Sequence, residues 1–156
     1  MKRLTIAVVY LFVALVAVNA QTLKSLFDKY GENPQFQYVA MGPGMLNMAS
    51  GLIDGNTINQ EMLEKITEIK VLASFNADSV SREKLSADVD KVLKKGKFDN
   101  VLEAHEGKEE VKIYFQNNKG KDANLLFINQ GQYGVNLIWM TGTFTQEDLA
   151  EMVSKQ

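Results

Sequence analysis

Four runs of β-favouring residues, separated by short breaks, fill most of the second half of the chain. The runs cover residues 101–105, 111–116, 124–129 and 135–141, and every break contains a glycine. Breaks this short return each strand alongside its predecessor, as hairpin connections do. The pattern therefore predicts an antiparallel four-stranded meander. Because the last run is apolar on both faces, we expect it to lie centrally and beneath a helix.

The first half of the chain has mostly helical periodicity. Helices are predicted over 22–30, 45–52, 57–66 and 79–95, strands over 35–41 and 69–75, and a final helix after Thr145. Gly31 and Gly96 are expected to end two of these helices in the left-handed conformation. Thr145 and Asp148 have the spacing of a capping box. Helices followed by a meander predict an α+β fold, with a mostly antiparallel sheet and helices packed on one face.

The N-terminus has the three parts of a secretory signal peptide. Lys2 and Arg3 precede an apolar run over 6–18, and a small-residue exit ends at Ala20. The run is shorter than the roughly 20 apolar residues that a membrane-spanning helix needs. We therefore expect cleavage before Gln21, secretion to the periplasm or the extracellular space, and no transmembrane segment afterwards.

Residues 21–156 are enough to bury a core as one domain. Their composition limits how the domain is stabilised and which partners it can bind. There is no cysteine, so an exported protein of this sequence depends on burial rather than on disulfides. Loss of residues 1–20 removes two bases and no acid, so the formal net charge falls from −2 to −4. This mild acidity argues against a nucleic-acid partner.

Three blocks of the sequence carry a family resemblance. They read LFDKYGENPQFQYVAMGPGMLNM at 26–48, IKVLASF at 69–75 and LIWMTGTFTQEDL at 137–149. With the exported start, they resemble an uncharacterised family of exported bacterial proteins, domain of unknown function 4252, typical of the Bacteroidetes. The resemblance spans essentially the whole chain after the leader and implies a compact α+β fold in the cell envelope. It implies no reaction, cofactor or functional residue.

A strip on one predicted strand is the candidate binding surface. Lys112, Tyr114 and Gln116 alternate along 111–116, so they share one face of the sheet. We expect that face to be free of helices and Tyr114 to be exposed. The strip would then contact an unknown protein or a small ligand of the cell envelope.

The single histidine, His105, suggests an alternative chemistry. Alternation places Glu103 on the same strand face, and the two side chains could begin a metal site. One histidine rarely anchors a structural zinc site, and such a cluster is also typical of a solvated turn. Without a cysteine or a Gly-x-Ser-x-Gly elbow, nothing points to nucleophilic catalysis. A paired-carboxylate hydrolase stays open, because two acids can meet from any part of a chain.

Three short motifs have structural interpretations beside functional ones. Gly42-Pro43-Gly44 could hold an anion, but the residues of nucleotide-binding loops are missing, so a tight turn is favoured. Met41, Met45 and Met48 could bind Cu(I), but a core helix face is favoured. Asp78-Ser79-Val80 matches a short O-glycosylation pattern of the resembled group, and Asp78 or Ser79 could equally cap a helix.

The sequence therefore favours an exported, non-catalytic binding or interaction module without a cofactor. The alternative is an exported metal-binding protein or hydrolase that uses His105 and nearby glutamates.

Overall fold

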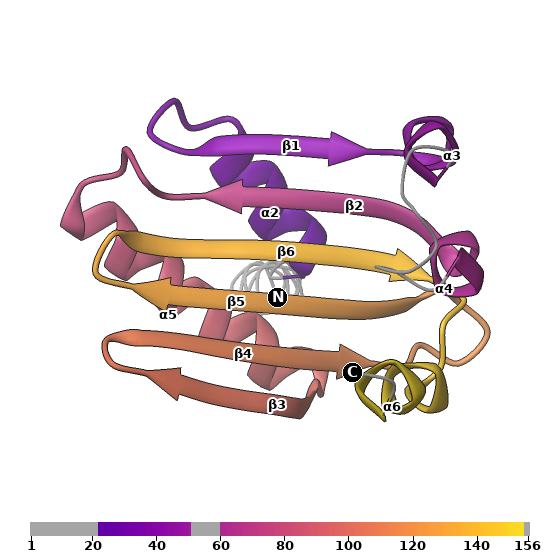
Figure 1. Ribbon diagram of the computed structural model, residues 1–156. Coiled ribbons are helices and arrows are strands. Elements are labelled where there is room, and N and C mark those ends of the chain that lie inside the picture. The colour runs from indigo at the N-terminus through magenta and orange to yellow at the C-terminus, as the bar shows by residue number, and fades with distance from the viewer. Residues whose placement is uncertain (1–21, 51–59, 155–156) are drawn as a thin grey trace, which may run out of the picture.

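The computed structural model describes residues 22–50 and 60–154. Its six strands form one antiparallel sheet, in the order β1-β2-β6-β5-β4-β3 (Figure 1). The strands are β1 Gln37–Met41, β2 Ile66–Ala73, β3 Asp99–Glu106, β4 Glu109–Gln116, β5 Ala123–Gly131 and β6 Gly134–Gly142. Strands β3 to β6 form an antiparallel meander, which confirms the prediction made from the short glycine-containing breaks. β6 lies between β2 and β5, which confirms its predicted central place. The predicted leader lies outside the described residues.

Five helices accompany the sheet in the described part of the chain. They are α2 Leu23–Gly31, α3 Pro43–Ser50, α4 Gln60–Lys65, α5 Ser79–Gly96 and α6 Gln146–Ser154. Thr22 caps α2 and Asp78 caps α5, each by accepting a hydrogen bond from a backbone N–H of the first turn. The α+β fold with a mostly antiparallel sheet is thus confirmed.

The two predicted glycine caps were wrong. Gly31 and Gly96 are the last residues of their helices, and neither has a positive φ. Lys97 takes the left-handed conformation instead, with φ 53°. A Cβ on Gly96 would lie 2.6 Å from the Phe98 ring, so this glycine is required for close approach rather than for handedness.

Two further boundaries differ from the prediction. Ile66 begins β2 instead of ending a helix, and α3 begins at Pro43, so the Gly42-Pro43-Gly44 turn is shorter than expected. Proline is favoured in the first turn of a helix, because its missing N–H would have no helical partner there.

One face of the sheet, which we term the covered face, packs against α2 and α5. Its centre is formed by Leu72, Leu126 and Leu137, none of which is exposed. Phe27 of α2 packs against Trp139 of β6, with ring centroids 5.3 Å apart. Figure 1 shows both helices on the far side of the sheet.

The opposite face, which we term the open face, carries the side chains of Ile113, Phe127 and Ile138. A second core cluster forms at one end of it, where Leu46 of α3, Met62 of α4 and Leu149 of α6 meet strand residues. Figure 1 shows α3, α4 and α6 at that end, while none of the five described helices crosses the rest of the near face. No helix in the described ranges has the length and apolar content of a membrane span.

Candidate functional site

The strand registers place the predicted strip on the covered face. Tyr114 pairs with Leu126 and Lys112 pairs with Ile128, and both partners belong to the core beneath α2 and α5. The three strip residues share one face, as predicted, but the expectation that this face is free of helices was wrong. β4 is apolar at Ile113 and Phe115 as well, so its alternation did not reveal which side the helices cover.

Gln116 has a structural partner in the fold. Its Nε2 donates to the Gly96 carbonyl at the end of α5. Its Oε1 accepts a hydrogen bond from Asn124 Nδ2 at 2.8 Å, and Asn124 Oδ1 accepts one from Trp139 Nε1 at 2.8 Å. This series of hydrogen bonds joins β6, β5 and β4 to the C-terminal end of α5.

Lys112 and Tyr114 line a small cavity of about 250 Å³ beside α5. Tyr114 is half-buried against the core, so the expectation that it is exposed was wrong. Lys112 Nζ lies 2.8 Å from Glu110 Oε1, and this hydrogen bond raises the pKa of Lys112. A binding role for the strip stays a prediction.

The structure brings His105 and Glu103 together, as alternation predicted, and adds Glu110 from β4. His105 Nε2 lies 3.0 Å from Glu103 Oε1, and His105 Nδ1 lies 3.6 Å from Glu110 Oε1. The hydrogen bond with His105 holds the pKa of Glu103 below its ordinary value. One ligand atom from each of the three residues lies within 4.8 Å of the others, so the cluster has the spacing to hold a metal ion. Lys112 competes for the Glu110 carboxylate.

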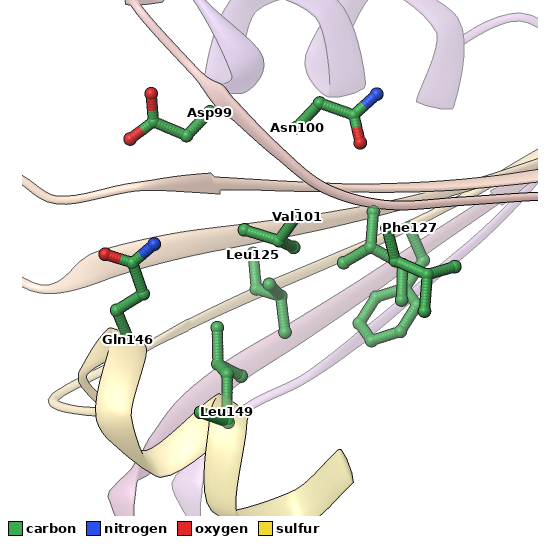
Figure 2. A pocket seen from close by; sticks show the side chains of 10 residues that line it. Asp99, Asn100, Val101, Leu125, Phe127, Gln146 and Leu149 are labelled. Carbon is green, nitrogen blue, oxygen red and sulfur yellow. The ribbon is translucent and has the colours of Figure 1, made fainter.

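A groove of about 770 Å³ opens on the open face between α6 and strands β3 to β5 (Figure 2). Its lining residues are Asp99, Asn100, Val101, Leu102, Ile113, Leu125, Phe127, Gln146, Leu149 and Ala150. Figure 2 shows Leu125, Phe127 and Leu149 converging on the space between the strands and α6. Asp99 supplies the ionisable side chain of the lining, which contains no base.

A β-bulge shapes the outer wall of this groove. The register between β3 and β4 shifts between Asn100 and Leu102, so one residue of β3 has no partner on β4. A bulge bends its strand and redirects side chains. Val101 and Leu102 both line the groove as a result, and both remain more than one-third exposed.

The groove continues into an apolar surface across the sheet. On the open face, Val39 of β1 is 51% exposed. Four neighbours on β2 and β6 are partly exposed on the same side: Ile69, Val71, Ile138 and Met140. Sequence reasoning missed this surface. The sequence does contain a sign of it: several predicted strands are apolar on both faces, and the predicted helices are too few to cover both faces of the sheet.

The other motifs have structural outcomes. Asp78 Oδ1 accepts a hydrogen bond from Ser81 N at 2.7 Å, which confirms the cap and lowers the pKa of Asp78. Glycosylation of Ser79 stays a prediction. Met45 and Met48 are exposed, whereas Leu46 of α3 is buried, so the core-face interpretation of those two methionines was wrong.

Comparison with known proteins identifies the family. Neither curated proteins nor solved structures gave a match. A family model, Domain of unknown function (DUF4252), matches residues 30–152, which include all six described strands. The match covers most of the chain and agrees with the three sequence blocks. The chain belongs to the DUF4252 family of domains of unknown function.

Proposed function

We propose that the protein is an exported, non-catalytic binding protein of the cell envelope. It takes an apolar segment of a partner protein in the groove between α6 and strands β3 to β5. The observation that carries this proposal is the apolar groove on a sheet face that the described helices cover only at one end. Export rests on the signal-peptide pattern before Gln21.

Leaving this apolar surface in water costs free energy. Each Å² of apolar surface removed from water contributes about 25 cal/mol. Contiguous exposed apolar patches of several hundred Å² usually mark interaction sites. The groove therefore offers a favourable free energy of association to any partner whose apolar side chains fit it.

A protein segment fits the site better than an enclosed small ligand does. Cavities that hold small molecules cover most of the ligand surface. Here the apolar floor runs on from Phe127 to Ile138 and Val71, beyond the groove itself. An extended apolar strip of this kind is typical of a docking surface.

A neutral apolar dye, Nile red, tests the apolar site with the protein that starts at Gln21. We expect dye fluorescence to rise on binding, and Leu102→Gln to weaken the affinity about three- to tenfold through lost apolar contact. Val80→Gln is the matched control, because Val80 is an exposed apolar residue of α5 on the other side of the sheet. Equal affinities of the two variants would contradict the proposal.

Mass spectrometry of fractionated cells tests the export step separately. The expected species is a chain that starts at Gln21 in the envelope or culture fraction. A full-length chain with its leader in the cytosolic fraction would contradict export.

The cluster of Glu103, His105 and Glu110 supports metal binding as a second candidate function. Carboxylate and imidazole ligands at this spacing suit zinc. Calorimetric titration with zinc should show one site per chain that His105→Ala abolishes and Glu106→Gln leaves intact. Zinc binding that survives His105→Ala would exclude this site.

A further inference from the structure

We propose that the partner segment is a cationic amphipathic α-helix that lies beside α6 on the open face. This inference rests on the proposed function, because it names the occupant of the same groove. It follows from the layer arrangement of the fold, the protection of the neighbouring sheet edge, and the charge around the groove.

The layer arrangement leaves space for one more helix. On the covered face, α2 and α5 pack against the sheet, whereas α6 lies at one end of the open face (Figure 1). Packed helices lie about 8–10 Å apart. A helix laid next to α6 would therefore rest on the groove floor formed by Leu102, Ile113 and Phe127.

The adjacent sheet edge is protected against an added strand. Among the described strands, β3 is the edge strand and pairs only with β4, and it carries both a bulge and charged residues. Asp99, Glu103 and Glu106 place carboxylates along β3, with Glu103 on the covered face and Glu106 on the open face. Bulges and charges are the usual devices that prevent edge-to-edge pairing. A helix on the face is thus favoured over a strand at the edge.

Acidic residues lie near both ends of the strip of sheet that forms the groove. Asp99 lies in the lining, and α6 carries Glu147 and Glu151 with no base between Gln146 and Ser154, while Lys65 neutralises Asp148 by an ion pair. At the far end, Glu106 pairs with Glu109 across β3 and β4. Lys108 in the intervening turn offsets one of these charges.

The middle of the open face is apolar. The described strand side chains on this side include no lysine or arginine, whereas Lys70 and Lys112 both lie on the covered face. An anionic amphiphile would meet the acidic rim unfavourably. Basic side chains that flank an apolar stripe complement the rim, and such complementarity favours encounter and orientation.

The dimensions agree with a helix of ordinary length. β4 has 8 residues. At about 3.4 Å per residue, such a strand spans roughly 27 Å. A helix rises about 1.5 Å per residue, so about 18 residues cover the same distance.

Two synthetic peptides of about 18 residues test the inference. Both have leucine at helical i, i+3, i+4 and i+7 spacing; one has lysine and the other glutamate at the remaining positions. Fluorescence anisotropy with the protein from Gln21 onward measures affinity at about 50 mM and 300 mM salt. Circular dichroism measures the helicity that each peptide gains.

We expect the lysine peptide to bind at least about tenfold more tightly than the glutamate peptide at low salt, with a smaller difference at high salt. Asp99→Asn and Glu147→Gln should each weaken the lysine peptide about twofold to fivefold. Glu83→Gln, an exposed carboxylate of α5, is the matched control and should change nothing.

The outcomes separate the two proposals. Equal affinities of the peptides, both weakened by Leu102→Gln, would overturn the cationic partner and leave the apolar site intact. Binding without a gain of helicity would overturn the helical partner. Affinities that Leu102→Gln leaves unchanged would contradict the proposed function as well.

Discussion

Asp88 is a buried carboxylate that joins the two helices of the covered face. Its side chain on α5 accepts hydrogen bonds from Tyr30 Oη at 2.9 Å and Lys29 Nζ at 2.7 Å, both on α2. Burial raises the pKa of Asp88, but the hydrogen bonds from Lys29 and Tyr30 outweigh it, so the pKa lies below its ordinary value. The charged form is thus the one that stabilises the fold.

Asp88→Asn should lower the free energy of unfolding at pH 7 by about 1–3 kcal/mol, because the buried Tyr30 hydroxyl and the Lys29 ammonium lose their charged acceptor. A carboxylate whose pKa is lowered on folding stabilises above its unfolded pKa and loses that effect as the pH falls through the folded pKa. The gap between wild type and variant should therefore shrink below about pH 4. Urea unfolding at several pH values measures it, and a gap independent of pH would contradict this role.

Gly134 is required for both its conformation and its close packing. Its φ is 139°, and a Cβ there would lie 2.7 Å from Ser74 Oγ. Ser74 is fully buried, and its Oγ accepts a hydrogen bond from Val135 N at 2.7 Å. The hydroxyl therefore cannot move without breaking that bond.

Gly134→Ala should destabilise the protein by about 2 kcal/mol or more. Gly120→Ala is the matched control, since Gly120 has φ 74° and open space around its Cβ position. The control pays the conformational cost alone, about 1 kcal/mol. Thermal unfolding of the two variants compares them, and similar melting temperatures would show that contact with Ser74 is unimportant.

Helix α6 forms one wall of the groove, and its start is fixed by reciprocal hydrogen bonds. Asp148 Oδ2 accepts from Thr145 N at 2.7 Å, and Thr145 Oγ1 accepts from Asp148 N at 3.3 Å. Lys65 adds an ion pair with Asp148 at 2.7 Å. The hydrogen bond from Lys65 lowers the pKa of Asp148.

Thr145→Ala should cost about 1 kcal/mol in the stability of α6, because the Asp148 N–H loses its acceptor. Hydrogen exchange of the α6 amides should accelerate while that of β5 and β6 amides changes little. Ser154→Ala at the other end of α6 is the control. Uniform acceleration across the sheet would contradict local opening of α6.

At the level of helices and strands, local patterns were sufficient for most predictions. The capping box at Thr145, the cap at Asp78 and the meander of β3 to β6 depend on neighbours in sequence, and the structure confirms them. The predicted ends of α2 and α5 were wrong by one residue, because each glycine is the last residue of its helix and the next residue is the C-cap. At Gly96, the ring of Phe98 and the side chain of Gln116 both approach closely, and Gln116 belongs to β4, so this contact is tertiary packing.

The candidate site could not be predicted in the same way. It depends on which face of β4 the helices cover, and both Ile113 and Tyr114 are compatible with a buried side. It also depends on the bulge before Leu102 and on where α6 settles. These are long-range properties, so alternation identified the members of each face but assigned the helices to the wrong one.

The complete fold combines a well-packed covered face with an open face that is apolar over most of its strands. Helices α3, α4 and α6 close only one end of the open face. An antiparallel sheet can leave one face to water, but that face is then usually polar; a partner layer on the remainder would remove the exposed apolar side chains of this face from water. This arrangement is the reason for proposing a binding protein.

Chemical-shift mapping by nuclear magnetic resonance provides the decisive test, with the lysine–leucine peptide titrated into the protein from Gln21 onward. We expect amide shift changes concentrated in β3, β4, β5 and α6, centred on Leu102 and Phe127, with α2 and α5 unaffected. Changes concentrated on α2 and α5, or around Lys112 and Tyr114 on the covered face, would contradict this expectation.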